Sequence, residues 1–524
     1  MQGTTRNLLA ITAYCCLAAA LVRWPCIPYW NAAPLDPNFP LHALAAMGLA
    51  EGDLARLSYL EWPEGAVVRY VGWPPMAIAA ALNALLPPIP SMNLAVWAWT
   101  ALQGIGTWQI GKAWGWDRPG RFAAATGAIF APQALLALGN GQFENAALMP
   151  LLWTAWSCRE GRLLHFVPAF TLCLFSSPYQ GVCAVAAALL LSERVLRTAL
   201  AMAPVLGAAG LYYGTVAAGG VHASVAPAAA SMAEHASLTG LLLPLNIAED
   251  GGAGLPLAWE RIAKAGELAS ADIYSHRWPW LIPTASSHVG TALLILGAAG
   301  LWLRRRATSR TAAWGAVCLL LALGPALSLG SLQLPLPWAL AGFVPGLSEM
   351  QATCRFLSGL TAALLIGLPA VARTWRTAAA VSVLLAAEGL LASPAHWPLP
   401  ALEPVPSKFM ERAAEDSAAA FWPAPPVMAS YKVTMAALVM ETPLALFDEQ
   451  GAGMPEADGS WRRGTGEPVD STGRTPVKWR TDIEAAGVRT LLQFRDTTGS
   501  QAQPVAAGYG ECDEFFCIWT LGSN

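Results

Sequence analysis

Long apolar runs, separated by short polar turns that carry arginine, follow one another up to about residue 393. A straight helical crossing of a bilayer needs about 20 apolar residues. The runs predict about eleven membrane-spanning helices, several of them shorter than that length. They cover residues 7–23, 93–111, 121–139, 143–158, 163–178, 180–192, 198–217, 286–303, 311–329, 353–371 and 377–393.

Basic residues in the turns orient these helices, because Lys and Arg accumulate on the cytoplasmic side of membrane proteins. The run after Arg6 lacks a small-residue cleavage site, so we expect an uncleaved first span. The pattern predicts a multi-pass protein of the inner (cytoplasmic) membrane with a cytoplasmic N-terminus. Its external parts are loops 24–92, 218–285 and 330–352 and the C-terminus. The basic residues that mark the cytoplasmic turns are Arg6, Lys112, Arg118, Arg121, Arg159, Arg162, Arg194, Arg197, Arg304 to Arg306, Arg310, Arg373 and Arg376.

Residues 73–88, WPPMAIAAALNALLPP, are apolar but do not fit as another crossing. If they crossed, every later arginine cluster would lie outside. Proline pairs open and close the segment, and proline interrupts a continuous helix. We therefore expect a juxtamembrane or re-entrant helix here.

An acidic, aromatic and proline-rich insert lies between the first span and this helix. Within it, the spacing of Phe39, His42, Met47 and Leu49 predicts a short amphipathic helix that ends at Glu51, Gly52 and Asp53. Such a helix would lie along the bilayer surface. Asp36 stands just ahead of it, after a proline-rich entry.

Polar and charged residues return after His396, with apolar residues in short runs. We expect residues 1–393 to form the transmembrane domain and 394–524 a small extracytoplasmic α/β or α+β domain. In that compartment Cys512 and Cys517 either close a hairpin or remain thiols. The predicted elements are strands near Phe421, Leu444, Leu491 and Ile518 and helices at 407–420 and 481–487.

Composition supports a mainly α, polytopic membrane protein. The chain is 55% hydrophobic and 12% charged, against roughly 25% charged in soluble proteins. A net charge of −3 argues against a nucleic-acid partner. No metal site and no cofactor are predicted, because no zinc-ligand spacing is present. The cysteines expected as buried thiols are Cys15, Cys16, Cys158, Cys173, Cys183, Cys318 and Cys354.

The order of these motifs resembles the GT-C superfamily of polytopic glycosyltransferases, which includes the protein mannosyltransferases and the aminoarabinose transferase of lipid A. The residues that carry it are Asp36, Gly52-Asp53 at the predicted helix end, WPPM, and the turn GNGQFEN at 139–145. Trp73 stands where the family has lysine. Short elements are also similar to a broad group of bacterial membrane proteins, namely WPEG at 62–65, SSPY at 176–179, HVG at 288–290, VPGL at 344–347 and Arg355-Phe356.

The resemblance implies transfer of a sugar from a polyprenyl-phosphate donor to a glycan, lipid or protein acceptor at the external membrane face. Asp36 matches the general base of the family, and Glu144 is a candidate second acid. Arginine can bind a phosphate with two parallel hydrogen bonds. The candidate substrate-binding residues are His42, Arg56, Arg69, Gln142, Tyr179 and Arg355.

Structural roles compete with each of these functions. Asp36 between prolines suits an ordinary turn, and Glu144 suits the first turn of a helix. His42 suits the membrane interface, Arg355 a snorkelling side chain, and Tyr179 a kink between helices. For the whole chain, the alternative is a non-catalytic GT-C-like scaffold or a lipid or polysaccharide transport or assembly protein. A transporter should show internal repeats and polar residues at mid-membrane, and neither is seen.

Overall fold

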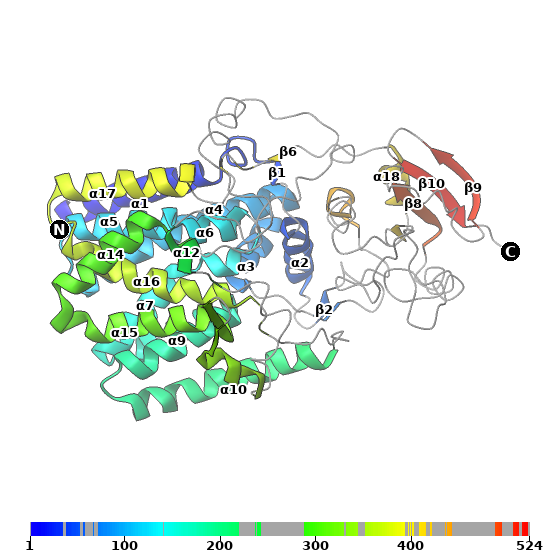
Figure 1. Cartoon of the computed structure of the whole chain (residues 1–524). Coiled ribbons are helices and arrows are strands. Elements are labelled where there is room, and N and C mark those ends of the chain that lie inside the picture. Colours follow the sequence, from blue (N-terminus) through cyan, green and yellow to red (C-terminus); the bar gives the residue numbers. More distant parts are fainter. Residues whose placement is uncertain are drawn as a thin grey trace.

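A computed structural model of the 524-residue chain shows a helical bundle joined to a small mixed region (Figure 1). For a number of the described residues, Arg56, Glu144, 213–219 and most of the C-terminal strands among them, only the backbone is described. The described residues are 2–34, 38–52, 56–57, 66–67, 72–139, 141–219, 236, 238–242, 288–329, 332–343, 350, 352–392, 397, 399, 401–402, 408–415, 420–421, 435, 437–442, 488–494, 507–512 and 516–521.

Helices occupy all the predicted spans, so the prediction of a mainly helical fold is confirmed. Short turns join most of them in sequence, and neighbours along the chain pack side by side. The helices of the bundle are α1 (Gln2–Val22), α4 (Pro88–Ala113), α5 (Arg118–Phe130), α6 (Pro132–Gly139), α7 (Leu148–Glu160), α8 (Leu163–Ser176), α9 (Pro178–Leu191), α10 (Val195–Gly219), α14 (Thr291–Leu303), α15 (Arg305–Ala322), α16 (Leu357–Gly367) and α17 (Trp375–Ala387).

Three helices of the described part are long and apolar enough to cross a membrane: Arg118–Gly139, Val195–Tyr212 and Thr353–Ala370. The first and third bury 94% of their apolar window and the second 17%, so the first and third lie inside the bundle and the second on its edge. Four shorter helices are also apolar, and the total number of crossings stays a prediction. These four are Arg6–Val22, Leu163–Ser176, Pro178–Leu191 and Thr291–Leu303.

One predicted span ends too late. Helix α15 stops at Ala322, and strand β4 (Ala326–Leu329) follows where the prediction continued the helix to residue 329. Gly324 has φ +81° and Pro325 comes next, and both features end a helix. Strand β4 forms an antiparallel hairpin with β5 (Leu332–Pro335).

The helix after Asp36 is present, but the prediction that it is amphipathic, with one polar face exposed, is wrong. Helix α2 (Phe39–Glu51) ends at Gly52, whose φ is +98°. Every residue from Phe39 to Gly48 is buried, because alanine and leucine make all its faces apolar and α3 and α4 pack against it. Helix α2 is therefore a core element of this end of the bundle.

The WPPM segment forms helix α3 (Trp73–Asn83), which packs against α2 and α4. Its 11 residues rise about 16 Å, and a crossing needs about 30 Å. The helix is therefore too short to span a bilayer by itself.

The C-terminal part contains a four-stranded sheet of order β7-β8-β10-β9. Strands are present at Phe421, Leu491 and Ile518 as predicted, while Leu444 and residues 481–487 lie outside the described residues. The helix predicted at 407–420 is shorter, because α18 (Lys408–Ala413) ends early and residue 420 begins a strand. Division into two domains stays a prediction. The strands are β7 (Ala420–Phe421), β8 (Thr490–Phe494), β9 (Ala507–Cys512) and β10 (Phe516–Leu521).

Most of the cysteines that the sequence predicts to be buried are buried in the structure. Six of the seven predicted thiols are buried and Cys16 is half-buried. Cys512 lies directly opposite Cys517 in the register of β9 and β10. Their side chains lie outside the described part, so whether they form a disulfide stays open.

Short elements complete the fold. Strand β1 pairs antiparallel with β6, which returns the chain after the bundle to the end of α1. These elements are β1 (Ala33–Pro34), β2 (Arg56–Leu57), β3 (Ala66–Val67), β6 (Ala401–Leu402), α12 (Leu238–Leu242), the 3₁₀ turns η1 (Phe143–Ala146), η2 (Pro337–Phe343), η3 (Thr353–Phe356) and η4 (Leu368–Ala370), and the π-helical turn η5 (Glu388–Ala392).

Candidate functional site

The candidate residues that the structure describes lie at one end of the bundle. Turns rich in arginine join α4 to α5, α7 to α8, α9 to α10 and α14 to α15. They share the end at which the N-terminus lies (Figure 1). Helices α2 and α3 lie at the opposite end, which faces the C-terminal sheet. η1, the start of α9 and η3 are at this end too, because each lies one helix length from an arginine-bearing turn.

The turn η1 forms a junction between three elements. The Gln142 N–H donates to the Ala137 carbonyl (2.8 Å), and the Asn145 N–H donates to the Gln142 carbonyl (3.0 Å). Phe143 is fully buried, and its ring centroid lies 5.3 Å from that of His42 on α2. We call this place the η1 junction. It contains the backbone of Glu144, whose side chain lies outside the described part.

A fully buried arginine lies beside the η1 junction. Arg23, just after α1, donates to Asn93 Oδ1 (3.3 Å) and to the Leu138 carbonyl (3.4 Å), and its Cζ is 6.0 Å from the Phe143 ring. A buried guanidinium requires such acceptors, since desolvation of an unpaired charge is costly. The sequence analysis missed Arg23, although an arginine at the end of the first span opposite the arginine-rich turns was a usable signal.

Asn93 connects this arginine to the segment that leads into Asp36. Its amide nitrogen donates to the carbonyls of Trp30 (2.9 Å) and Ala32 (2.8 Å). Strand β1 follows immediately and pairs with β6. The chain is thus held on the N-terminal side of Asp36, which itself lies outside the described residues.

His42 is buried in the protein interior, so the interpretation as a membrane-interface residue is wrong. Its Nδ1–H donates to the Asn38 carbonyl (2.8 Å). Burial lowers the pKa of His42 to about 4, and the bond to Asn38 opposes this only in part. His42 is therefore neutral near pH 7 and offers a donor or acceptor, not a positive charge.

The lowered pKa of His42 predicts acid sensitivity of the fold. Below pH 6.5 the imidazole of His42 is protonated in the unfolded chain. In the folded chain it stays neutral until the pH falls to about 4. Stability should therefore fall as pH drops, by about 2 kcal/mol at pH 5 for this group. Thermal unfolding of the parent and of His42→Gln at pH 7.5 and pH 5 measures it. The parent should lose more stability than the variant between the two values.

Exposed His165 provides the control, and His165→Gln should keep the pH response of the parent. If His42→Gln lost as much stability on acidification as the parent, neutral burial of His42 would be the wrong description.

Tyr179 and Arg355, two predicted site residues far apart in sequence, are in contact. The Ala352 N–H donates to the Tyr179 hydroxyl (2.9 Å), and the Arg355 guanidinium lies 5.3 Å from the Tyr179 ring centroid. Arginine over an aromatic face is favourable. Arg355 is half-buried in η3, directly before α16. Packing against the protein therefore contributes to its position, in addition to the snorkelling that the sequence suggested.

Polar contacts join the η1 junction to the start of α9, where Tyr179 lies. The Ser177 hydroxyl, at the N-cap of α9, donates to Asn145 Oδ1 in η1 (3.2 Å). The Gly72 N–H at the head of α3 donates to the Ser176 carbonyl (2.7 Å). Gln180 is fully buried, and neither polar atom of its amide has a partner among the described residues. A buried amide in that state marks a place where water or a ligand group completes the bonding.

Trp73 takes a structural position where the resemblance expects lysine. Its indole N–H donates to the Tyr212 hydroxyl (3.0 Å), and the two rings meet edge to face. This contact ties α3 to α10. The position supplies no positive charge for a phosphate, so within the described part Arg355 is the better placed of the predicted arginines.

The structure leaves several candidates unplaced. Asp36 and Arg69 lie outside the described residues, and only the backbone of Arg56 and Glu144 is described. That these four side chains lie near Tyr179 and Arg355 therefore stays a prediction. Across the ranges that are described, no group of three or more His, Cys, Asp or Glu residues could hold a metal ion.

A half-buried acid at this end was also missed. Glu388 begins η5, and its carboxylate accepts the Ala292 N–H (3.0 Å) at the start of α14, with His288 Nε2 3.8 Å away. The carboxylate therefore satisfies the unpaired amides of a helix N-terminus. A charged residue inside the apolar run LLAAEGLLA was the available signal.

Comparison with known proteins finds weak likenesses to solved structures. No family model and no characterised protein matches the chain by sequence. The arabinofuranosyltransferase AftD from Mycobacteria gives a TM-score of 0.48 at 15% identity over 99% of this chain and 41% of that one. Apo oligosaccharyltransferase from Archaeoglobus fulgidus gives 0.40 at 12% identity, over 93% of this chain and 69% of that one.

A third structure, archaeal oligosaccharyltransferase AglB from the same organism with an inhibitory peptide and a dolichol-phosphate, gives 0.41 at 11% identity. It is matched over 94% of this chain and 70% of its own length. The chain thus spans less than half of AftD and about two thirds of the other two. All three scores are under 0.5, so the function proposed below rests on the residues and contacts of this chain.

Proposed function

We propose that this chain is an integral membrane glycosyltransferase that moves a sugar from a polyprenyl-phosphate donor to an acceptor hydroxyl at the external membrane face. The observation that carries this proposal is the convergence of His42, η1, Tyr179 and Arg355 at the end of the bundle opposite the arginine-rich turns. These parts come from four separate stretches of sequence. Their assembly around buried polar groups is what a reaction site at this face requires.

The proposed reaction is a displacement at the anomeric carbon. The Asp36 carboxylate takes the proton of the acceptor hydroxyl as the hydroxyl oxygen bonds to the anomeric carbon. The bond from that carbon to the phosphate oxygen breaks, and polyprenyl phosphate leaves with the electron pair. A base placed at the attacking hydroxyl contributes about 10²- to 10⁴-fold in rate.

Arg355 is the proposed partner of the leaving phosphate. Its guanidinium offers parallel N–H donors for phosphate oxygens, and the Tyr179 ring beneath it holds its orientation. Arg56 and Arg69 are proposed as further phosphate contacts and Glu144 as a second acid. His42 and Gln142 are proposed to contact substrate, with His42 as a neutral hydrogen-bonding group.

The same arrangement supports a proposal for the location of the protein. We propose the inner membrane, with the N-terminus and the arginine-rich turns in the cytoplasm and the C-terminal part outside. A single cysteine added after Asn524 should react with a membrane-impermeant thiol reagent from outside intact cells. Labelling only after the cytoplasm is opened would reverse the proposed orientation.

Mass spectrometry of the purified protein tests the donor class. A polyprenyl phosphate, with or without its sugar, should copurify and be displaced by added polyprenyl-phosphate sugar. Arg355→Gln should lower the amount retained by about tenfold, as expected for loss of a charged phosphate contact. Copurification of bulk phospholipid alone, unchanged in the variant, would favour a non-catalytic scaffold.

A further inference from the structure

We propose that the groove between α1, α5 and α17 binds one anionic phospholipid, with an acyl chain in the groove and the headgroup phosphate at Arg118 and Arg376. The groove has a volume of about 430 Å³. The binding requires that the bundle lies in a membrane, and it does not depend on glycosyl transfer. The walls of the groove include Leu17 and Leu21 of α1, Phe122 and Phe130 of α5, and Ala379 and Val383 of α17.

The length of the groove suits a hydrocarbon chain. Helix α5 contacts both α1 and α17, and it forms the floor between them. Phe122 and Phe130 both line the groove and lie eight residues apart on α5. This separation is about 12 Å at the helical rise. The groove therefore runs along the helices, as the acyl chains of a bilayer do.

The side chains that line the groove are apolar, apart from Tyr14 and Ser382. The Tyr14 hydroxyl already forms a hydrogen bond with Thr126 Oγ1 (2.8 Å), and Ser382 is buried. A concave apolar lining removes the surface of an apolar ligand from contact with polar groups. A sugar or a peptide in this groove would leave its own polar groups unpaired. The lining therefore favours a hydrocarbon chain.

Two arginines lie at one mouth of the groove. Arg118 lies one turn before Phe122 on α5, and Arg376 lies one turn before Ala379 on α17. Residues three or four apart lie on the same side of a helix. The Trp375 ring packs on the Phe122 ring, with 6.0 Å between their centroids, so the first turns of the two helices are neighbours. Both arginines are therefore at the same end of the groove.

The charges of these two arginines are not neutralised within the described part of the chain. Both side chains are exposed, and neither forms an ion pair with a described residue. The neighbouring Asp117 carboxylate accepts the Gly120 N–H (2.8 Å) as the N-cap of α5. A cation in the first turn of a helix is disfavoured by the helix dipole, so helix stability explains neither arginine. A phosphate between them pairs with both guanidinium groups.

The two ends of the groove differ, which gives the lipid one orientation. Trp375, at the basic end, is 56% exposed, and tryptophan prefers the level of the lipid headgroups. At the other end the Trp397 indole N–H donates to the Leu21 carbonyl (2.7 Å). No charged residue of the described chain lines the groove itself. The headgroup therefore lies at the arginine-rich end of the bundle, where basic pockets between helices bind anionic headgroups.

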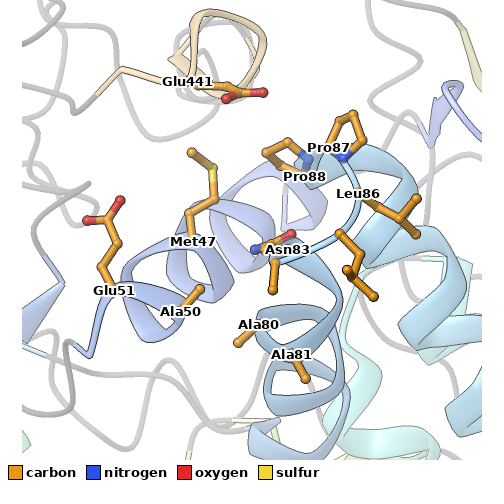
Figure 2. A pocket seen from close by; sticks show the side chains of 12 residues that line it. Met47, Ala50, Glu51, Ala80, Ala81, Asn83, Leu86, Pro87, Pro88 and Glu441 are labelled. Atoms are coloured by element: carbon orange, nitrogen blue, oxygen red, sulfur yellow. The ribbon is translucent and has the colours of Figure 1, made fainter.

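Another cavity of the protein has the opposite electrostatics. It lies between α2, α3 and Glu441, at the other end of the bundle, and has a volume of about 650 Å³ (Figure 2). Glu51 and Glu441 line it, and no lysine, arginine or histidine does so among the described residues. Carboxylates repel a phosphate. An anionic phospholipid should therefore bind at the groove beside α5 and not in this cavity.

Native mass spectrometry of the full chain, purified and delipidated in detergent, tests the proposal. The protein is titrated with phosphatidylglycerol and, separately, with phosphatidylcholine that has the same acyl chains. The first phosphatidylglycerol should bind about tenfold more tightly, because its headgroup carries no cation to oppose the arginines. Equal affinity for the two lipids overturns the proposal. Displacement of phosphatidylglycerol by polyprenyl phosphate also overturns it, because the groove would then be a site for the donor lipid.

A double variant tests the headgroup contacts. Arg118→Gln with Arg376→Gln should weaken phosphatidylglycerol about tenfold, to the level of phosphatidylcholine. The melting temperature without lipid should not fall, since neither arginine has an ion pair in the described chain. The control is Arg305→Gln with Arg306→Gln, which removes the same charge from exposed residues of the turn after α14. This control should bind like the parent, and an equal loss in both double variants overturns the proposal.

A matched pair of single variants tests the acyl-chain contacts. Ala379 and Ala380 are adjacent exposed residues of α17, and of these two Ala379 lines the groove. Ala379→Phe places a ring in the groove and should weaken phosphatidylglycerol about tenfold, because the ring and the acyl chain compete for the same volume. Ala380→Phe should bind like the parent. Equal binding by these two variants overturns the assignment of the groove.

Discussion

Asp36→Asn should abolish most glycosyl transfer while leaving donor binding intact. The amide keeps the size and hydrogen bonding of the carboxylate but cannot accept the acceptor proton. Loss of a general base lowers the rate about 10²- to 10⁴-fold. The proposal places Asp36 between two anchored points, since Pro34 is held in β1 and the Asn38 carbonyl accepts from His42. The fold should therefore survive the substitution. Turnover of labelled polyprenyl-phosphate sugar and donor retention are measured in parallel.

Glu144→Gln is the matched control for this effect. Both substitutions convert an acid to its amide in a region that we propose to be external. A small loss in Glu144→Gln with a large loss in Asp36→Asn supports a single base, and equal large losses indicate a site shared by two acids. Turnover of Asp36→Asn at the rate of the parent would contradict the assigned base.

Gly300→Ala should strongly destabilise the bundle. A Cβ on Gly300 of α14 would overlap the carbonyl oxygen of Gly367 at the end of α16, and a Cβ on Gly367 would overlap that of Gly297. These neighbours are backbone atoms, so no rotamer change relieves the overlap. Helices α14 and α16 would have to separate. We expect a loss of about 3 kcal/mol, visible as a lower melting temperature in detergent and a smaller monodisperse fraction.

A glycine-to-alanine substitution on another helix should have the opposite effect on stability. Gly207 lies within α10, and nothing lies within 4 Å of a Cβ built on it. Alanine is a better helix former than glycine by about 1 kcal/mol. Gly207→Ala should therefore keep or raise stability. A similar response of the two variants would show that helix propensity, and not the close crossing at Gly300, decides the outcome.

Helix positions were predictable because turns with glycine, proline or arginine separate most of the apolar runs. Helix α2 illustrates the limit. Its end at Gly52 was evident from glycine after a periodic stretch, but its burial was not. The spacing of Phe39 and His42 suggested one apolar face, whereas the alanines between them fill the other faces against α3 and α4. Burial of a small-residue helix depends on its neighbours, which no local pattern contains.

The sequence predicted which residues belong to the site, but it could not predict which of them are in contact. The approach of Arg355 to Tyr179 depends on how η3 packs on α9, and these elements are remote in sequence. Glu441 could not be linked to α2 and α3 for the same reason. Arg23, in contrast, stands at the end of an apolar segment and Glu388 inside another, and an ionisable residue at such a place was a signal that the sequence offered.

Transfer from a defined donor is the measurement that tests the central claim most directly. Purified protein is incubated with a panel of polyprenyl-phosphate sugars, each isotopically labelled at the anomeric carbon, together with a panel of neutral oligosaccharide acceptors. We predict that one donor is consumed, that free polyprenyl phosphate and labelled glycoside appear in equal amounts, and that Asp36→Asn suppresses both. Donor that is bound but never consumed by the parent with any acceptor would contradict the claim and leave a non-catalytic membrane scaffold.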